Sequence, residues 1–194
     1  MARVASNLVK PADHPSLPHI APNNIESGTG KLLKYRTVAE DQVISSKHLF
    51  ESGQVLYSKI RPYLAKVAIV DFAGLCSADM YPVATDLDPR YLKWWMLSPD
   101  FTRLAAGQQA RTVLPKINKT ALGQLPVPVP PLDEQLRIGD LLESHLSRLD
   151  AADAGLVSSE LRVGALKRSL LRELHTGPLV PLAELAWDAG YGTS

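Results

Sequence analysis

The segment at residues 126–131, with the sequence PVPVPP, constrains the fold more than any other part of the 194-residue chain. Each proline fixes its own φ and disfavours the helical region for the residue before it, so the segment must be extended and stiff. A leucine-rich stretch begins directly after it, in which apolar residues recur at intervals of seven. These residues are Leu142, Leu149, Leu156, Val163 and Leu170. A stiff segment therefore joins the first part of the chain to a long helix.

The leucine-rich stretch predicts one helix over residues 133–173, a rod of about 60 Å at about 1.5 Å per residue. Asp133 stands in its first turn, where a carboxylate is favoured, and Gly177 with the proline after it provides a stop signal. A rod of this length cannot bury its apolar stripe against the domain before it, so we expect a coiled coil with another helix. The alternative is a pair of shorter helices that break at Gly155 or Gly164 and fold back on each other.

Residues 1–131 predict a domain of short strands with a few helices. Four prolines within the first 24 residues exclude a helix there and indicate a loop-like segment. The β-prone runs are residues 31–38, 54–58, 67–70 and 80–85, the last of them broken by Pro82. This order of elements predicts the α+β class, with a mixed sheet.

Two helices of this domain carry explicit start signals. Asp88 followed by Pro89 is typical of an N-cap and a first helical residue, and residues 91–97, apolar except for Lys93, supply the helix body. Ser98 and the proline after it repeat the signal, and Gly107 stops the second helix. We therefore expect two consecutive helices between residues 88 and 107.

Charged residues are distributed unevenly about residue 131. Residues 1–131 hold 15 Lys/Arg and 10 Asp/Glu, whereas residues 132–194 hold 6 and 10. The first part is therefore basic and the second acidic, although the formal net charge of the whole chain is +1. A basic domain permits contact with nucleic acid through the first part only. Ordinary scatter of surface charge explains these numbers equally well.

The cysteine content and the hydropathy indicate a cytoplasmic protein without a membrane contact. Cys76 is the single cysteine, which excludes an intramolecular disulfide framework and a cysteine-rich zinc cage. No apolar run approaches the roughly 20 residues of a membrane span, and the first residues do not open a signal peptide.

The glycines at residues 28–30 suggest a phosphate-binding loop but do not match its pattern. Ile25 stands where the first glycine of that loop is required, and Leu32 stands where a serine or threonine would bind magnesium. A turn between extended segments explains the glycines better.

Other reactive side chains also lack the partners that catalysis or metal binding requires. His14 and His19 are separated by prolines and have no nearby cysteine or acidic pair. Cys76 lies in an apolar context that favours packing over nucleophilic chemistry. Ser58 and Lys59 are adjacent strand residues, so they point to opposite faces. We therefore expect no catalytic residue, no metal site and no enzyme activity in this chain.

Two polar, basic segments, residues 58–66 and 108–120, combine the side chains that DNA recognition uses. Their lysines and arginines suit phosphates, and their Arg, Gln, Asn and Thr side chains suit purine edges or a thymine methyl group in the major groove. A helix cap at Asn118 and ordinary solvated loops explain the same composition equally well.

Four motifs occur in an order that points to one family. They are residues 18–26 (PHIAPNNIE), 53–64 (GQVLYSKIRPYL), 76–79 (CSAD) and 125–138 (LPVPVPPLDEQLRI). Together they resemble the specificity subunit of type I restriction-modification systems. The first three resemble successive parts of its target recognition domain, and the last is similar to its junction with a long spacer helix. The matches run through most of the chain in order.

The resemblance implies a DNA-reading subunit without catalysis of its own. Such domains read the major groove of one half of a bipartite target, while spacer helices fix the distance between the halves and dock methyltransferase subunits; restriction subunits join the assembly. S-adenosylmethionine, ATP and magnesium then belong to the partner subunits, and no cofactor is expected in this chain. Family members usually carry two recognition domains and two spacer helices, whereas this chain carries one of each, as in a half-length form.

We expect the DNA-contacting residues in the two basic segments and at the end of the chain. The full set is Lys59, Arg61, Lys66, Gln108, Gln109, Arg111, Thr112, Lys116, Lys119, Tyr191 and Thr193. Among them, Gln108, Gln109, Arg111 and Thr112 are expected nearest the bases. Either Lys59 or Lys66 could instead lie beside Tyr63.

The tail after the helix, residues 178–194, resembles the opening strand of another recognition domain, which would precede the first motif. An antiparallel pairing of two helices brings the end of one beside the start of the other. We therefore expect three parts: a recognition domain at 1–131, a spacer and dimerisation helix at 132–177, and a tail that completes the partner's domain in a two-fold homodimer.

Two other function classes compete with DNA recognition. A small transferase or hydrolase would need a convergent catalytic group, which the sequence does not contain. A coiled-coil assembly adaptor that does not read DNA is the stronger rival. Specific DNA binding that weakens steeply with salt would separate the two, because phosphate contacts release counterions.

Overall fold

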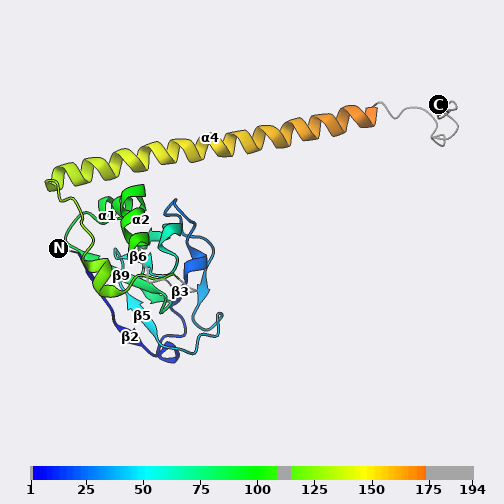
Figure 1. Ribbon diagram of the computed structural model, residues 1–194. Coiled ribbons are helices and arrows are strands. Elements are labelled where there is room, and N and C mark those ends of the chain that lie inside the picture. Colours follow the sequence, from blue (N-terminus) through cyan, green and yellow to red (C-terminus); the bar gives the residue numbers. More distant parts are fainter. Residues whose placement is uncertain (1, 109–114, 174–194) are drawn as a thin grey trace, which may run out of the picture. The chain divides into compact units, whose positions relative to one another are not determined.

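The computed structural model describes residues 2–108 and 115–173 (Figure 1). The chain divides into two compact units, Met1–Glu143 and Ser144–Ser194. In its described residues, the first unit contains two sheets, three short α-helices and the first turns of the last helix. Within the described residues, no helix is both long and apolar enough to cross a membrane.

The first sheet is antiparallel and has four strands in the order β1-β9-β6-β7. Its strands are β1 (Ala2–Val4), β6 (Val55–Ser58), β7 (Val67–Ile69) and β9 (Met80–Thr85). All four residues of β6 are buried, because this strand is central and both of its faces are covered. The strands expected at residues 54–58 and 67–70 are therefore confirmed.

Strand β9 is continuous through Pro82, so the expected break there is wrong. The Pro82 carbonyl accepts a hydrogen bond from the Ala5 amide at 2.8 Å, on the β1 side. The N and O atoms of one residue in an antiparallel strand point to the same neighbour, so the missing N–H of the proline also faces β1. That position lies just beyond the last paired residue of β1, Val4. The pairing with β6 consequently loses no donor.

The second sheet is mixed and has five strands in the order β2-β5-β8-β3-β4. Its strands are β2 (Leu8–Val9), β3 (Pro18–Ile20), β4 (Arg36–Thr37), β5 (Lys47–Phe50) and β8 (Gly74–Cys76). Only β3 and β8 pair in parallel. Gly74 is required by packing, because a Cβ atom there would lie 2.6 Å from Cζ of Phe50 and 2.7 Å from the Pro18 carbonyl oxygen.

The first 24 residues contain more regular structure than their prolines suggest. Three short strands, β1 to β3, lie in this segment, so the loop-like expectation is wrong for them. The prolines occupy positions that need no N–H donor: Pro18 opens β3, while Pro11 and Pro22 open the 3₁₀ turns η1 (Pro11–Asp13) and η2 (Pro22–Asn24). The expected strand at 31–38 is reduced to β4 and one bridge between Leu32 and Ile25.

Two hydrophobic cores lie on opposite faces of the first sheet. Val55 and Tyr57 of β6 face a core shared with the helices, whereas Leu56, between them, faces a core shared with the second sheet. This alternation is the two-residue period of a strand buried on both sides. The domain is therefore built of three layers, helices, sheet and sheet, and the α+β class is confirmed.

The short helices begin where the sequence predicts. The helices are α1 (Pro89–Leu97), α2 (Pro99–Gly107) and α3 (Lys119–Gly123). Side-chain oxygens of Asp88, Ser98 and Asn118 accept hydrogen bonds from the third amide beyond each of them, at 2.8 to 3.2 Å. Each cap satisfies an amide that the helix itself leaves unpaired, which fixes the starting residue.

The last helix, α4 (Leu132–Glu173), is a single helix of 42 residues. The expected long helix is confirmed, and the alternative of a break at Gly155 or Gly164 is wrong. Its first turns, to Glu143, belong to the first unit. Its apolar stripe is uncovered in the single chain: the exposed members are Leu149, Leu156, Val163 and Leu170, at 52 to 66%, whereas Leu142 is half-buried.

Candidate nucleic-acid interface

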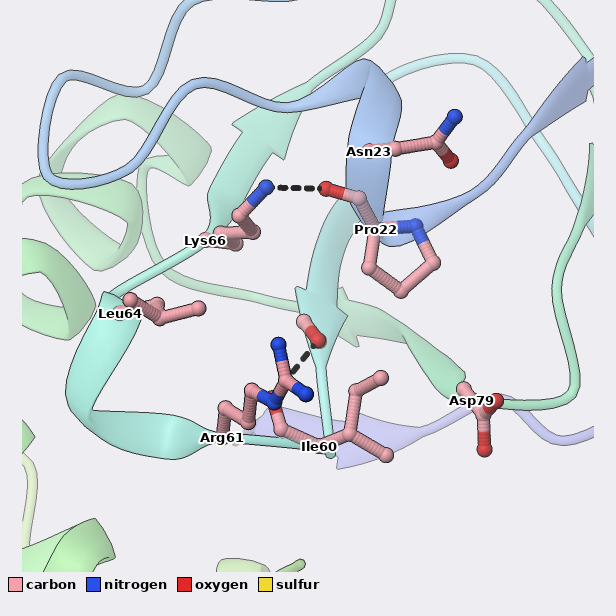
Figure 2. Close-up of a pocket in the computed structure, with 8 residues that line it drawn as sticks. Pro22, Asn23, Ile60, Arg61, Leu64, Lys66 and Asp79 are labelled. Carbon is pink, nitrogen blue, oxygen red and sulfur yellow. Dashed lines mark hydrogen bonds between the residues drawn. The ribbon is translucent and has the colours of Figure 1, made fainter. Parts of the chain in front are cut away.

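A pocket of about 320 Å³ lies where three loops of the domain meet (Figure 2). Pro22 and Asn23 come from η2, residues 58–66 from the end of β6 and the turn after it, and Asp79 from the loop before β9. In the view of Figure 2, Leu64 and Lys66 lie on one side and Asp79 on the other, with Arg61 between them.

Backbone geometry shapes the turn that carries Arg61. Arg61 and Ala65 both have left-handed conformations, with φ of 47° and 45°, and they flank the 3₁₀ turn η3 (Pro62–Leu64). Non-glycine residues rarely adopt this region, so the surrounding bonds must hold the turn in place. Pro62 and Ala65 are buried, whereas Arg61 and Tyr63 are exposed. The turn is therefore anchored from inside and presents polar side chains outward.

The two basic segments are joined by their backbones. Ile60 and Lys116 form an antiparallel bridge, the Arg61 amide donates to the Pro115 carbonyl at 2.7 Å, and the Ile117 amide donates to the Lys59 carbonyl at 2.9 Å. Ile117 is fully buried in the core beside the helices. The described end of the second segment, residues 115–117, is thus fixed to the turn that carries Arg61.

The side chains around the pocket offer both donors and acceptors. Nζ of Lys66 donates to the Pro22 carbonyl at 2.7 Å, so the ammonium group of Lys66 is held at the wall of the pocket (Figure 2). The exposed side chains are Asn23, Arg61 and Asp79. Arg61 can bind a phosphate or a guanine edge, and Asp79 can accept from an amino group of cytosine. Such a mixed set suits base edges and backbone together better than phosphate alone.

Lys59 and Lys119, which we expected on the same face, lie elsewhere. Nζ of Lys59 is 5.4 Å from the centre of the Tyr81 ring, so its aromatic neighbour is Tyr81 rather than Tyr63. Lys119 lines a second pocket of about 400 Å³, together with Arg3, Glu51 and Gln54. The structure therefore brings Arg61 and Lys66 together and places Lys59 and Lys119 outside their pocket.

The remaining expected DNA contacts lie at the second segment or beyond the described residues. Gln108 is exposed at the end of α2, and Lys116 is exposed beside Ile60. The other five, Gln109, Arg111, Thr112, Tyr191 and Thr193, lie outside the described residues.

Three exposed side chains at this site were missed by reasoning from composition. Asn23 and Asp79 line the pocket, and Tyr63 is 53% exposed in the turn after Arg61. A signal for all three was present, because each lies in one of the first three family motifs. Those motifs are separate in the chain, with residues 27–52 and 65–75 between them, and the pocket is where they meet.

The reactive side chains near the site are engaged or buried. Ser58 is 2% exposed, and its hydroxyl donates to the Ile60 carbonyl at 3.0 Å. Cys76 is buried in β8, and burial raises the pKa of its thiol to about 12, which keeps it protonated. Nδ1 of His19 lies 2.8 Å from Oδ2 of Asp41. Within the described ranges, no three metal-ligating side chains cluster.

His48 makes the stability of the domain depend on pH. Burial lowers the pKa of His48 below its ordinary value of 6.5, and the nearby charges of Lys59 and Lys119 lower it further. His48 therefore binds a proton at a higher pH in the unfolded chain than in the folded chain. The part of the free energy of unfolding that results from this difference is fully present above pH 6.5 and is lost as the pH falls through the pKa of the folded state. We expect the Tm to fall between pH 7 and pH 5, and His48→Gln to flatten this dependence.

The matched control is His145→Gln, on an exposed turn of α4. Its melting curves should follow those of the wild type at every pH. If His48→Gln shows the same decrease in Tm as the wild type, groups other than His48 cause the acid sensitivity.

Comparison with known proteins places this chain in one family. Residues 8–153 match the family model described as "Type I restriction modification DNA specificity domain". The Escherichia coli "Type I restriction enzyme EcoDI specificity subunit" is 46% identical over 179 residues, which are 92% of this chain and 40% of that protein. The chain therefore belongs to the type I restriction modification DNA specificity domain family.

Solved structures share the fold at lower identity. The HsdS subunit from Thermoanaerobacter tengcongensis superposes with a TM-score of 0.70 at 22% identity, over 93% of this chain and 49% of that one. A chain from a structure of type I R-M system assembly and conformational transition gives 0.69, with the same identity and coverage. The chain thus spans 40 to 49% of the length of these relatives.

Proposed function

We propose that this protein reads one half of a bipartite DNA target, as the specificity component of a type I restriction-modification complex. The single observation that carries the proposal is the pocket where three separate family motifs meet and place Arg61 beside Asn23, Lys66 and Asp79. Residues far apart in the chain converge there on one exposed, polar site. A major-groove edge, with its donors and acceptors, is the surface that such a set of side chains fits.

In this proposal the protein has no catalytic role of its own. Methyltransferase subunits, and restriction subunits with them, supply the chemistry and hold S-adenosylmethionine, ATP and magnesium. The protein supplies the base contacts and a helix on which those subunits assemble, and it acts in the cytoplasm, where its DNA is found.

The proposal includes a two-fold homodimer. One recognition domain reads one half-site, so a bipartite target needs a second domain. The uncovered stripe on α4, with apolar residues at intervals of seven, provides a surface for an antiparallel pairing with the helix of a second copy. A homodimer would read two inverted copies of one half-site across a fixed spacer.

The decisive experiment is to methylate a random DNA pool with the full chain and its cognate methyltransferase, and to sequence the modified sites. We expect one palindromic, bipartite motif with a spacer of constant length. The control reaction contains the methyltransferase alone and should yield no motif.

The assembly adaptor without DNA reading predicts a different result. Methylation would then follow the methyltransferase's own preference, and the motif would be the same with and without this chain. Such a result would overturn the proposed function. A non-palindromic motif would keep the DNA-reading role and would exclude the homodimer.

A further inference from the structure

The extended segment before α4 is bound at every second residue. The carbonyl oxygens of Pro126, Pro128 and Pro130 accept hydrogen bonds from Nε1 of Trp95 at 3.2 Å, from the Tyr91 hydroxyl at 3.0 Å and from Nε2 of Gln135 at 2.8 Å. Tyr91 and Trp95 are one helical turn apart on α1, so they reach successive carbonyls on one side of the segment. The stiff link is therefore fixed along α1.

Gln135 connects this link to both helices. It lies in the first turn of α4 and is 4% exposed. Its Nε2 binds Pro130, and its Oε1 accepts from the Asp88 amide at 2.9 Å. Asp88 is also the cap of α1. A buried amide whose two ends are both hydrogen-bonded holds its neighbours in one arrangement, because any displacement leaves a buried polar atom unpaired.

Gly139, one turn further along α4, receives the side chain of Arg90. A Cβ atom at residue 139 would lie 3.4 Å from Cβ and 3.5 Å from Nε of Arg90. An alanine would make ordinary contact, but a longer side chain would meet the arginine. Glycine is a poor helix former, so its place on this buried face of α4 has a packing reason.

Ion pairs complete the contact between α1 and α4. The Arg90 guanidinium lies 2.5 Å from Oδ1 of Asp140 and 3.6 Å from Oε2 of Glu143, and Nζ of Lys93 lies 3.5 Å from Oε1 of Glu143. Arg90 also pairs with Asp88 at 3.3 Å. Together, the α1–α4 clamp consists of Asp88, Arg90, Lys93, Gln135, Gly139, Asp140 and Glu143.

We propose that the α1–α4 clamp determines which spacer length the protein accepts between its two half-sites. The clamp fixes the direction in which the first turns of α4 leave the recognition domain. When the helix pairs with a second copy, this direction would determine where the second recognition domain lies. Arg90, Gln135 and Gly139 are positioning residues in this mechanism, since they connect α1 to α4 rather than bind DNA. The inference rests on the proposed function and names the determinant of one part of its specificity.

The test compares Gly139→Leu with Gly155→Leu in the methylation experiment. Both changes place leucine on the same helix, but Gly155 has no atom near its Cβ position. We expect Gly139→Leu to shift the spacer by one or more base pairs or to spread it over several lengths, with both half-site sequences unchanged. Gly155→Leu should keep the wild-type spacer. Arg90→Gln, which removes the ion pairs of Arg90 without added bulk, should broaden the spacer distribution.

A second readout tests the clamp without DNA. Spin labels at Ile44→Cys in the domain and Leu141→Cys on α4 report the distance between the two elements; both sites are exposed, and the natural Cys76 is buried. Labelled protein is diluted with unlabelled protein, so that only distances within one chain are measured. We expect one narrow distance distribution in the wild type and in Gly155→Leu, and a shifted or broader one in Gly139→Leu and Arg90→Gln.

The outcomes separate the inference from the proposed function. If Gly139→Leu and Arg90→Gln change the distance distribution but leave the spacer unchanged, the inference is overturned while DNA reading stands. If neither variant changes the distance distribution, the clamp does not fix α4 and the inference also fails. A wild-type protein that directs no motif at all contradicts the proposed function itself.

Discussion

Replacing both Leu149 and Leu156 by aspartate is expected to convert the proposed homodimer into a monomer. Both side chains are exposed in the single chain, at 60 and 65%, and they are seven residues apart on one face of α4. In an antiparallel pair, these two positions place four carboxylates in the apolar contact. Each buried, unpaired carboxylate costs several kcal/mol, so the dimer dissociation constant should rise by at least about 1,000-fold. Light scattering at micromolar concentration would measure the mass.

The matched control places aspartate on exposed, polar positions of the same helix, as Arg148→Asp and Arg162→Asp. This variant should remain dimeric, with the same helix content by circular dichroism. A monomeric wild type would show that the stripe is not a dimer contact. The same conclusion would follow if the Leu149→Asp, Leu156→Asp variant kept the wild-type mass.

Local signals in the sequence were sufficient for the helices. Asp88 and Ser98 cap helices with amides only three residues away, so their effect does not depend on the rest of the fold. The long helix was also predictable, because its heptad spacing is repeated over many turns. Gly155 and Gly164 do not break it, since neither is joined by a proline or by other turn residues.

The strands near the N-terminus could not be predicted from their own residues. Strand β1 is three residues long and pairs with β9, which lies about eighty positions later in the chain. Its existence depends on that partner and not on local propensity. Pro82 shows the same dependence: the proline is harmless only because its nitrogen faces the end of β1, and this direction is set by the pairing.

The candidate site was also predictable only in part. Arg61 and Lys66 were identified from composition, because each basic residue of an expected loop can be read directly from the sequence. Their separation from Lys59 and Lys119 was not visible, since it follows from how the turn after β6 and the start of α3 are placed in the folded domain. The role of Gly139 was hidden as well, because only the packing of Arg90 across it distinguishes it from the other glycines of α4.

Arg61→Gly is expected to weaken specific DNA binding while leaving the fold intact. Glycine accepts the left-handed backbone at this position, where φ is 47°, so the change removes the guanidinium without disturbing the turn. A bidentate arginine contact to guanine contributes about 1–3 kcal/mol of discrimination, which corresponds to about 5- to 150-fold in affinity for the cognate site. Fluorescence anisotropy with cognate and scrambled duplexes would measure both affinities.

Salt dependence then identifies what Arg61 contacts. If Arg61 binds a phosphate, the slope of log K against log salt concentration should become less steep by about 0.9. The affinities for the cognate and the scrambled duplex should then decrease equally. If it binds a base, the slope stays and only the cognate duplex weakens. Lys119→Ala serves as the matched control, because Lys119 lies at the other pocket. Should Lys119→Ala weaken binding while Arg61→Gly does not, the DNA would lie against the second pocket, and the pocket of Arg61, Asn23 and Asp79 would not be the reading site.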